Sequence, residues 1–414
     1  MQICLIGVAH PCHNPRLLRE ADSLAEMGHE VRVVAPSISP ELAERDRRHM
    51  AVRRWRLQSV DCCPIGLAGK WRSFVVRGKR RFASEVFQTF GVEYLAETGY
   101  TTALSRLKRT ASLERADWFI AHTQAALPVA VSAAKKFGAR VGFDCEDLLS
   151  ATDGGGSDVV RLLEKKYLQS CSYVSVPSEL IARRLVDDYG IRDPVVLYNC
   201  FPTKLAAKLA PPSDRVISNT MRVHWFSQTI GPGRGLEEAI DAIGMLNGPA
   251  ELHIRGHVLE SYRNHIEILA NQRTVELFVH PLIDHDLVIE SLRDFDIGLA
   301  LERTSNDGYS LTISNKIFSY LLAGLAVAAS DTPGQREAMQ GYPEAGFLYP
   351  CGSSEALANA LQRWLDNRES LLLAQQSAWN AARERFCWDL EQQKFLEQLA
   401  LSVPTVPLAH STTA

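Results

Sequence analysis

Residues 3–35 read ICLIGVAHPCHNPRLLREADSLAEMGHEVRVVA, and this stretch indicates the fold class. It opens with a short apolar run, Ile3–Val8, and closes with another, Val31–Ala35, as buried strands do. Between them, apolar residues recur at helical spacing. Asn14 suits the helix N-cap, Pro15 its first position and Gly28 the left-handed position after its end. Strand, helix and strand in so short a stretch predict a βαβ unit and therefore a parallel sheet.

The same alternation recurs in two series. The first predicts further strands and helices at 117–121, 126–137, 140–144, 159–170, 173–176, 178–189 and 195–198. The second predicts strands and helices at 223–226, 235–246, 251–255, 277–280, 284–292, 297–301, 315–322, 326–330, 354–367 and 371–399. The pattern predicts an α/β protein with two doubly wound, Rossmann-like domains facing a central cleft.

The expected domain boundaries follow from where this periodicity stops. An N-terminal domain covers 1–200, and a proline-bearing connector follows at 201–222. A C-terminal domain covers 223–385. A final helix at 386–400 is expected to cross back to the N-terminal domain, ahead of a disordered tail at 401–414.

Composition excludes several classes of protein. The chain has 414 residues, of which 46% are hydrophobic and 22% charged, as in soluble globular proteins. Its longest apolar run, Tyr320–Ala329, is too short to span a membrane. No basic leader precedes the first strand, so no secretory signal is expected. Nine cysteines without a C-x-x-C pair argue against a disulfide framework and a zinc site. These features indicate a cytoplasmic protein.

Positive charge is concentrated between Arg45 and Phe82. Twelve Lys or Arg residues against two Asp give this segment a net charge of +10, whereas the whole chain carries −3. Aromatic and branched apolar residues are interleaved with these charges: Trp55, Trp71, Phe74, Val75, Val76 and Phe82. Basic residues beside exposed aromatic ones suit an anionic membrane surface. A solvated surface whose aromatic residues pack inward, or a nucleic-acid contact, are the alternatives.

A glycine-rich loop follows the first strand of the second domain. It runs from Ser227 to Glu237, with Gly231, Gly233 and Gly235 ahead of a helix. Glycines let the backbone approach a ligand closely, and the helix N-terminus attracts anions. Arg234 can then grip a phosphate. A tight turn with a surface arginine is the alternative, and the loop is neither a P-loop nor a dinucleotide fingerprint.

A second helix start is expected at the same edge. Ser314 suits the N-cap, Gly324 the end of the helix, and Lys316 lies in its first turn. A lysine there opposes the helix dipole, which favours anions. A bound phosphate would explain its position, although lysines at helix starts also occur without a ligand.

The first domain offers one histidine and a carboxylate group at strand ends. His122 follows the strand at 117–121, and Asp144, Glu146 and Asp147 follow the strand at 140–144. Such carboxylates can orient hydroxyl groups or act as a base. A structural histidine and a solvated acidic loop are equally compatible with the sequence.

Several of these stretches resemble family 4 of the bacterial glycosyltransferases. They are Asn14-Pro15-Arg16 with Arg19-Glu20-Ala21, Leu24–Val31, Ala121-His122-Thr123, Leu197-Tyr198-Asn199, Ser227–Glu237 and Asn315–Val327. The resemblance extends over about residues 1–400 and is most specific in the first 35 residues and the two cleft loops. It implies the GT-B fold. It also implies a retaining transferase that takes a sugar from a nucleotide-sugar donor without a metal ion or other cofactor.

The resemblance also assigns roles to individual residues. It implies catalytic roles for His122 near the donor sugar, Arg234 on the donor diphosphate and Lys316 at the second helix start. The donor-binding residues that we expect are Gly7, Ser227, Gly233, Gly256, Glu302, Ser314, Asn315 and Ser319. The expected acceptor-side residues are His10, Asn14 and Arg16.

One motif of the family is altered. The family carries two glutamates eight positions apart, and the matching positions here are Leu311 and Ser319. Glu302, after the strand at 297–301, is the nearby carboxylate that can replace one of them, and Ser319 can still bond a ribose hydroxyl.

The expected function is sugar transfer to an acceptor in surface polysaccharide or glycolipid synthesis, with a lipid-linked glycan as one possible acceptor. The basic segment Arg45–Phe82 would attach the enzyme peripherally to the inner face of the cell membrane. Two alternatives are a catalytically silent GT-B protein that partners another glycosyltransferase, and a sugar-nucleotide epimerase. A nucleic-acid partner is not expected.

Overall fold

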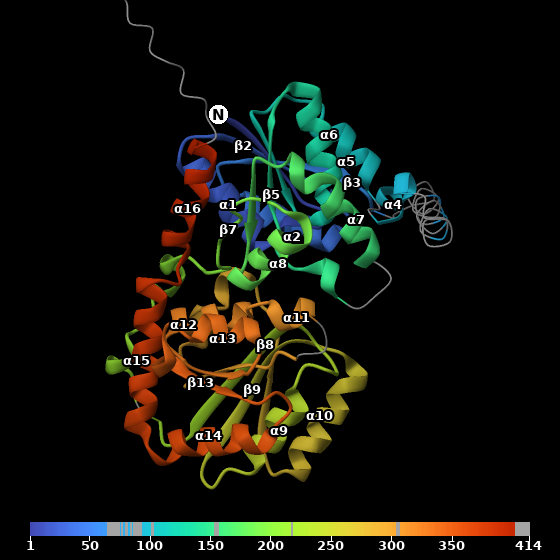
Figure 1. The fold of residues 1–414 in the computed structure, drawn as a ribbon. Coiled ribbons are helices and arrows are strands. Elements are labelled where there is room, and N and C mark those ends of the chain that lie inside the picture. Colours follow the sequence, from blue (N-terminus) through green and yellow to red (C-terminus); the bar gives the residue numbers. More distant parts are fainter. Residues whose placement is uncertain are drawn as a thin grey trace, which may run out of the picture.

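The computed structural model contains two parallel sheets, each in its own half of the molecule (Figure 1). It describes residues 1–63, 75, 78, 82, 85, 93–100, 103–152, 157–216, 218–303 and 307–401. The first sheet has seven strands in the order β3-β2-β1-β4-β5-β6-β7, and the second has six in the order β10-β9-β8-β11-β12-β13. Every neighbouring pair is parallel. The α/β architecture with two Rossmann-like sheets is confirmed.

The N-terminal half contains the predicted strands and helices, and its described residues between 40 and 111 add a strand and three helices that were not predicted. Its elements are β1 (Gln2–Ile6), α1 (Pro15–Glu26), β2 (Glu30–Ser37), α2 (Pro40–Met50), β3 (Arg56–Asp61), α4 (Glu93–Tyr100), α5 (Leu104–Ala111), β4 (Trp118–His122), α6 (Leu127–Phe137), β5 (Arg140–Asp144), α7 (Ser157–Tyr167), β6 (Tyr173–Val176), α8 (Glu179–Tyr189) and β7 (Val195–Val196). The predicted cap of α1 is present, since Asn14 Oδ1 accepts from the Leu17 N–H at 3.0 Å.

The C-terminal half contains β8 (Met221–Ile230), α9 (Leu236–Gly244), β9 (Ala250–Val258), α10 (Glu260–Gln272), β10 (Glu276–His280), β11 (Ile297–Ala300), α11 (Asp307–Leu311), α12 (Asn315–Ala323), β12 (Ala326–Ser330), α13 (Pro333–Met339), β13 (Gly346–Tyr349), α14 (Ser354–Asp366), α15 (Arg368–Glu384) and α16 (Trp388–Leu401). The helix predicted at 284–292 is wrong, because the chain there makes only two short 3-10 turns, the first of which buries no side chain. Helix α10 was not predicted, since it buries only a narrow stripe, Tyr262, Ile266 and Ala270.

The single long helix predicted at 371–399 is also wrong. The chain breaks between α15 and α16, where the Trp388 N–H donates to the Phe201 carbonyl at 3.0 Å. Beyond this break α16 lies against the N-terminal half (Figure 1), and Trp388 Nε1 donates to Ser23 Oγ of α1 at 2.8 Å. Phe395 and Leu399 of α16 are buried in the same hydrophobic cluster as residues of β1 and α1. The chain therefore crosses between the two halves twice, near Phe201 and near Trp388.

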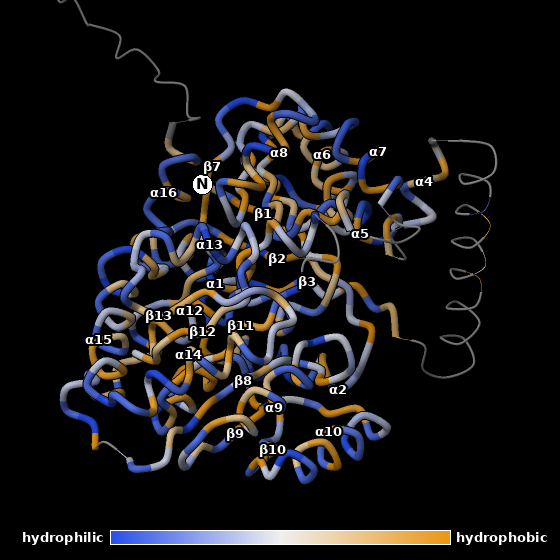
Figure 2. Tube along the Cα trace, turned by 60° about the horizontal axis from the view of Figure 1, so that its bottom comes forward, coloured by the Kyte–Doolittle hydropathy of each residue, from blue (hydrophilic) through white to orange (hydrophobic). Residues whose placement is uncertain are grey.

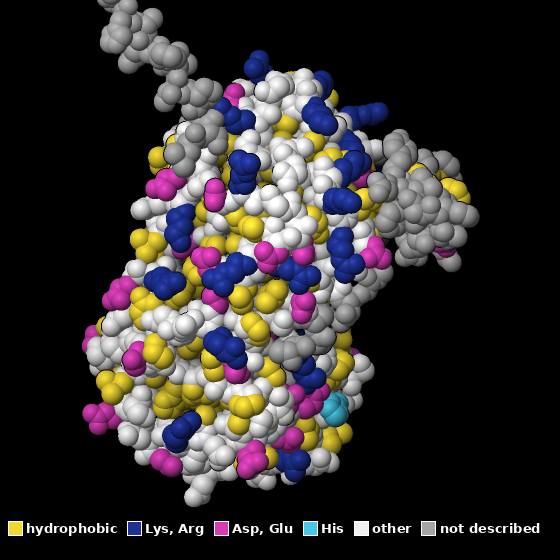
Figure 3. Space-filling model, in the orientation of Figure 1, with side chains coloured by type: hydrophobic (Ala, Val, Ile, Leu, Met, Phe, Trp, Pro, Cys, Tyr) yellow, Lys and Arg dark blue, Asp and Glu magenta, His cyan; other side chains and the backbone are white. Residues whose placement is uncertain are grey.

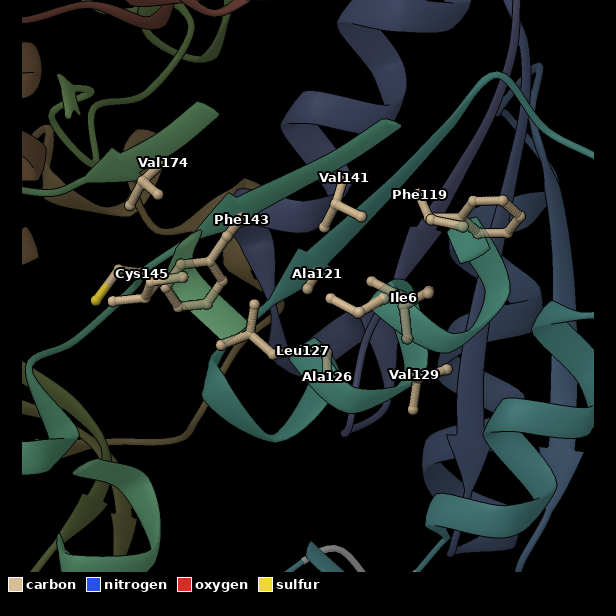
Figure 4. Close-up of a cluster of buried hydrophobic side chains, with 14 of the residues drawn as sticks. Ile6, Phe119, Ala121, Ala126, Leu127, Val129, Val141, Phe143, Cys145 and Val174 are labelled. Atoms are coloured by element: carbon tan, nitrogen blue, oxygen red, sulfur yellow. The ribbon is translucent and has the colours of Figure 1, made fainter. Parts of the chain in front are cut away.

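Each sheet packs its apolar side chains against the helices that cover it. In Figure 4, Leu127 and Val129 of α6 lie below Ala121 of β4 and Phe143 of β5, and Ile6 of β1 extends the same cluster. Figure 2 shows hydrophobic stretches inside both halves and hydrophilic ones mainly on the outer helices and loops. Among the helices that the structure describes, none is both long enough and apolar enough to cross a bilayer.

Much of the basic segment lies outside the described residues, which omit 64–74, 76–77 and 79–81 of it, and the tail at 402–414 is likewise outside. Two aromatic residues of that segment are described and they differ, since Phe82 is 64% exposed whereas Trp55 is not a surface group. Trp55 is buried, and its Nε1 donates to Asp22 Oδ1 at 2.7 Å. The aromatic residues interleaved with the basic charges are therefore not all exposed.

Candidate active site

A cleft of about 1300 Å³ separates the two domains and is lined by both. The N-terminal wall comes from the segments after β1 and β5, and the C-terminal wall from the ends of β8, β9 and β11 and the start of α12. Basic and acidic side chains mix along the junction of the two halves on the face seen in Figure 3. Parallel α/β sheets bind ligands at this edge, where the strands end and helices begin.

The C-terminal wall carries an ion pair that faces the cleft. Glu302 Oε1 accepts from Ser314 Oγ at 2.8 Å and from Lys316 Nζ at 3.1 Å. The Lys316 charge is the main reason why the pKa of Glu302 lies below its ordinary value. Lys316 Nζ also lies 5.6 Å from the centroid of the buried Trp225 ring, which restricts the ammonium further. The site thus holds a fixed cation and an ionised carboxylate side by side.

The start of α12 differs from an ordinary capped helix. Ser314 occupies the N-cap position, but its hydroxyl bonds Glu302 and makes no cap hydrogen bond. The first turn of α12 therefore meets the cleft without a side-chain cap, and free backbone N–H groups at a helix start can bind an anion. Asn315 and Ser319 also line the cleft, and the buried Ser319 hydroxyl donates to the Asn315 carbonyl at 3.2 Å.

The glycine-rich loop joins β8 to α9 at the side of this wall. Gly233 and Gly235 have φ of +78° and +79°, which other residues adopt at a cost. Gly256, at the end of β9, is needed because a Cβ there would lie 2.0 Å from the Ser227 carbonyl oxygen, beside the irregular end of β8. Ser227 and Gly256 line the cleft, whereas Gly233 and Arg234 are not among its lining residues. Arg234 is exposed, and its charge is near enough to contribute to the lowered pKa of Glu302.

The N-terminal wall buries a charged cluster behind its surface. His122, the last residue of β4, is fully buried, with Nδ1 3.0 Å from Glu146 Oε1 and Nε2 3.3 Å from Glu20 Oε2. Burial alone would lower the pKa of His122, but Glu20, Glu146 and Asp144 raise it to about 10. His122 therefore carries a proton at neutral pH and balances the carboxylates around it.

Arg16 neutralises the same cluster from α1. It is 2% exposed; its Nε and Nη2 each donate to one Asp144 oxygen at 2.6 Å, and Nη1 donates to the Leu197 carbonyl at 2.7 Å. A bidentate pair of this kind is stronger and geometrically more specific than a single neutral hydrogen bond. The sequence analysis named Arg16 and Asp144 but did not pair them, although both flank strand ends that the parallel sheet brings together.

Asn14 and His10 hold loops of the N-terminal wall. Asn14 lines the cleft, caps α1 and donates through Nδ2 to Glu146. His10 is buried, and its Nδ1 lies 2.6 Å from Asp46 Oδ2. The backbone N–H groups of Ile38 and Ser39 donate to His10 Nε2 at 2.8 and 3.2 Å, so the ring proton is on Nδ1. Neither His10 nor the buried Gly7 at the end of β1 is among the cleft-lining residues.

One group of side chains has the spacing of a metal site. Among the described residues, Glu20, His122 and Asp144 have ligand atoms within 4.8 Å of one another. All three are fully buried, and Arg16 and the protonated His122 already supply the positive charge. We therefore interpret this group as an internal ion network and assign no metal to it.

The cleft also contains residues that the sequence analysis did not assign to the site. His13, Glu41 and Arg45 line its N-terminal side, and Arg263 its C-terminal side. Arg45 Nη2 lies 3.1 Å from Asp284 Oδ1 of the other domain. Glu41 and Arg45 belong to α2 and Arg263 belongs to α10, two helices that the sequence analysis did not predict.

Comparisons with known proteins agree with this geometry. A family described as Glycosyl transferase 4-like domain matches residues 13–200. Those residues form a glycosyl transferase 4-like domain. A search of curated protein sequences finds no match for the chain.

Solved structures of similar shape extend the resemblance to almost the whole chain. HepE of Anabaena, in complex with UDP and glucose, has a TM-score of 0.69 at 17% identity. The match covers 97% of this chain and 100% of the HepE chain. Sucrose-phosphate synthase from Thermosynechococcus elongatus has a TM-score of 0.69 at 15% identity, with the same coverage. TarM from S. aureus has a TM-score of 0.69 at 8% identity, covering 96% of this chain and 99% of TarM. The two-domain fold is therefore GT-B, as the sequence predicted.

Proposed function

We propose that this protein is a retaining glycosyltransferase that uses a nucleotide-sugar donor. The observation that carries the proposal is the C-terminal wall of the cleft. There the uncapped start of α12, Lys316 and the nearby Arg234 offer positive charge where the diphosphate of a donor would lie. HepE, whose fold is similar, has been solved in complex with UDP-glucose, which supports the choice of donor class.

The expected chemistry needs charge stabilisation at the leaving group. As the bond between the sugar and the diphosphate breaks, negative charge grows on the phosphate oxygens. Lys316, Arg234 and the helix N-termini would stabilise this charge from fixed positions, in place of a metal ion. Departure and attack on the same face of the sugar retain its configuration and need no protein nucleophile. Enclosure of the reacting groups between the two domains would keep water away from the donor.

Glu302 supplies the carboxylate that the altered motif lacks in this proposal. Leu311 and Ser319 stand where the family carries glutamates, whereas Glu302 is held in the cleft by Ser314 and Lys316. Only its Oε1 is used by those two groups, so we assign Oε2 to a hydroxyl group of the donor. Ser319, at the buried end of the cleft, is assigned to the ribose.

Thermal unfolding with a panel of UDP-, GDP-, ADP- and dTDP-sugars tests the proposal. A ligand at 100 times its dissociation constant stabilises the folded protein by about 2.7 kcal/mol. We expect one nucleotide to raise the melting temperature, and Arg234→Ala to remove that rise without lowering the melting temperature of the free protein. Arg47→Ala, on exposed α2, is the control that should retain it. No rise with any nucleotide would contradict the proposal.

The altered motif favours one second candidate, a catalytically silent GT-B protein that partners another glycosyltransferase. Loss of both glutamates is what a protein without selection for donor turnover would show. This candidate predicts no stabilisation by any nucleotide sugar, together with stable association with an active glycosyltransferase in a pull-down from the native organism. Stabilisation by a nucleotide that Arg234→Ala abolishes excludes it.

We further propose that the acceptor is a lipid-linked glycan and that the basic segment attaches the enzyme to an anionic membrane. The described part of that segment supports this, since Arg47 and Arg48 are 73% exposed and Val52 is 83% exposed. Each such cation contributes about 1 kcal/mol near anionic headgroups. Sedimentation with phosphatidylglycerol vesicles should bind the protein at low salt and release it at high salt, whereas phosphatidylcholine vesicles should not bind it. Absence of binding to the anionic vesicles at every salt concentration would contradict it.

A further inference from the structure

Glu146 carries the ion network of the N-terminal wall to the surface of the cleft. It lies two residues beyond β5 and lines the cleft, with 20% of its side chain exposed. Its Oε1 accepts from Asn14 Nδ2 at 2.5 Å and lies 3.0 Å from Nδ1 of the buried His122. None of the described residues donates to its other oxygen, Oε2. Glu146 thus has one carboxylate oxygen anchored in the protein and one available to a ligand.

Asp147 places a second carboxylate beside Glu146. Its side chain is exposed to the cleft, while its backbone carbonyl accepts from Nε2 of the buried Gln124 at 3.0 Å. Desolvation between the two domains raises the pKa of Asp147 to about 7. The charges of Glu146 and, from the opposite wall, Glu302 raise this pKa further, whereas Arg16 lowers it. Asp147 therefore lies within electrostatic reach of a carboxylate on each wall of the cleft.

The cations around these carboxylates already have acidic partners. Arg16 donates to both oxygens of Asp144, and Lys316 Nζ lies 3.1 Å from Glu302 Oε1. In the networks of the two walls, five carboxylates accompany three cations: Glu20, Asp144, Glu146, Asp147 and Glu302 with Arg16, His122 and Lys316. In the proposed function, Lys316 and Arg234 also meet the diphosphate of the donor. The space beside the diphosphate, between the two walls, is therefore rich in acceptor oxygens and carries net negative charge.

We propose that Glu146 and Asp147 select a donor whose sugar is neutral and exclude a donor whose sugar is a uronic acid. The inference rests on the proposed transfer from a nucleotide sugar and narrows the donor to one class of sugar. An ionised carboxylate accepts hydrogen bonds and donates none, so it binds a hydroxyl group and repels a second carboxylate. Glu146 Oε2 is assigned to a sugar hydroxyl on the N-terminal wall, opposite the hydroxyl assigned to Glu302. Glu146 and Asp147 orient the sugar and take no proton from the acceptor, so attack and departure can share one face of the sugar.

A hexose and its uronic acid provide a closely matched pair of ligands. They differ at C6, where a CH2OH group becomes a carboxylate of similar size, so size alone distinguishes them poorly. A hydroxyl at this position can donate to Glu146 or Asp147, whereas a carboxylate cannot donate and adds a like charge to a cleft that is already acidic. Selectivity that arises from repulsion of the wrong ligand is set by the groups that repel it. Removal of one protein carboxylate should therefore improve binding of the uronate more than binding of the neutral sugar.

Titration calorimetry with paired nucleotide sugars measures the selectivity. The pairs are UDP-glucose and UDP-glucuronate, GDP-mannose and GDP-mannuronate, ADP-glucose and ADP-glucuronate, and dTDP-glucose and dTDP-glucuronate. For the nucleotide that binds, we expect the dissociation constant of the uronate to be about 100-fold or more above that of the neutral sugar, because contacts between like charges are strongly unfavourable. Equal affinity for both members, or tighter binding of the uronate, would overturn the inference and leave the proposed transfer standing. If no member of any pair binds, the proposed transfer fails and the inference fails with it.

Two substitutions test whether these residues cause the selectivity. Glu146→Gln keeps an acceptor oxygen for Asn14 and His122 and presents an N–H donor to the cleft, so the ratio of the two dissociation constants should fall about 10-fold. Asp147→Asn, at an exposed side chain, should lower this ratio similarly. Glu41→Gln is the matched control, because Glu41 is an exposed carboxylate of α2 that lines the same wall, and it should keep the ratio. An unchanged ratio in both Glu146→Gln and Asp147→Asn would overturn the inference.

The pH dependence of this ratio gives a readout that exclusion by size would not change. The uronate, Glu302 and His122 keep their charges between about pH 6 and about pH 8.5, because the pKa of Glu302 is lowered and that of His122 is raised to about 10. Asp147 instead loses its proton as the pH rises through about 7. The ratio in the wild type should therefore rise with pH over this range, and the ratio in Asp147→Asn should be lower and constant. A constant ratio in the wild type, or a rise of the same size in Asp147→Asn, would overturn the assignment of Asp147.

Discussion

The two walls of the cleft use charge in opposite ways. On the N-terminal wall, Arg16, His122 and Asp144 are buried, and Asp144 pairs with each of the other two. On the C-terminal wall, Lys316 and Glu302 form a pair that lines the cleft, with 16% and 25% of their side chains exposed. The first arrangement stabilises the fold and shapes the surface, whereas the second remains available to a ligand.

The depth of each residue in its strand explains the difference. His122 and Asp144 are the last residues of β4 and β5, and adjacent strands cover them. Glu302 lies two residues beyond the end of β11, and Lys316 is in the first turn of α12. Of these four residues, the two that lie outside a strand line the cleft, and the two that lie within a strand do not.

The largest effect is expected from Asp144→Asn. This change leaves the buried Arg16 guanidinium without its bidentate partner and His122 with one carboxylate fewer. Breaking a buried pair from one side costs about 3–5 kcal/mol, so the free energy of unfolding should fall by that amount. Urea unfolding measures it. Asp158→Asn, which removes an exposed carboxylate paired with Arg161, should change stability by less than about 0.5 kcal/mol and is the control. A similar loss in both variants would contradict the contrast between the walls.

The fold was predictable from local signals, and the ion network was not. Asn14, Pro15 and Gly28 indicate the first helix without any tertiary information. The pairing of Arg16 with Asp144 depends on the register of β4 and β5 and on how far α1 reaches across their ends. The sequence shows that Asp144 and Asp147 lie near the end of a strand. It does not show that Asp144 is buried and Asp147 exposed.

The next effect concerns binding and should leave stability almost unchanged. Lys316→Met removes the cation at the start of α12 but keeps the length of the side chain over Trp225. Loss of a charge-assisted contact to the diphosphate should weaken nucleotide-sugar binding about 10- to 100-fold, or roughly 1.4–2.8 kcal/mol. Titration calorimetry measures it. Because the pair with Glu302 is partly exposed, the unfolding free energy should fall by about 1 kcal/mol at most. If the variant instead loses stability and keeps its affinity for the nucleotide sugar, Lys316 stabilises the fold and does not bind the donor.

Two buried histidines, one in each half of the molecule, have pKa values that are shifted in opposite directions. The pKa of His122 is raised to about 10, whereas burial lowers the pKa of His224 well below its ordinary value. His224 stacks on Phe295 with ring centroids 4.4 Å apart, and neither ring nitrogen has a hydrogen-bond partner among the described residues. A histidine whose pKa is raised by folding stabilises the folded state below about pH 6.5, and this stabilisation is lost as the pH rises. A histidine whose pKa is lowered by folding stabilises the folded state above about pH 6.5, and this stabilisation is lost as the pH falls.

His224→Phe tests the acidic side of this contrast. Phenylalanine keeps the stack and cannot bind a proton in the unfolded chain. Acidification from pH 8 to pH 5.5 should therefore destabilise the variant less than the wild type, by about 1.4 kcal/mol for one pH unit below the unfolded pKa. Urea unfolding at the two pH values measures the difference. His265→Phe, at a side chain that is 58% exposed, is the control and should follow the wild type. Identical acid sensitivity in His224→Phe would show that this histidine is protonated in the folded state.

The two helices that were predicted wrongly depend, like the ion network that was not predicted, on contacts between distant parts of the chain. The segment 284–292 has helical spacing but contributes to the interdomain junction instead, where Asp284 meets Arg45 and Asp286 lies 3.9 Å from His49. The break before α16 is likewise set by pairing with Phe201 and not by a local stop signal. Both deviations occur where the two domains meet, which is where local sequence carries least information.

The smallest effect is expected at that junction. Arg45 and Asp284 join the two walls through an ion pair with 23% and 52% of the side chains exposed. An exposed pair of this kind contributes about 0.2–1 kcal/mol, so a double-mutant cycle with Arg45→Ala and Asp284→Ala should give a coupling in that range, and salt should reduce it. Urea unfolding at low and high salt measures the coupling. A salt-independent coupling above about 2 kcal/mol would mean that the pair is desolvated and holds the domains together. A weak coupling means instead that this contact leaves the cleft free to open, as a site that must admit a donor and an acceptor requires.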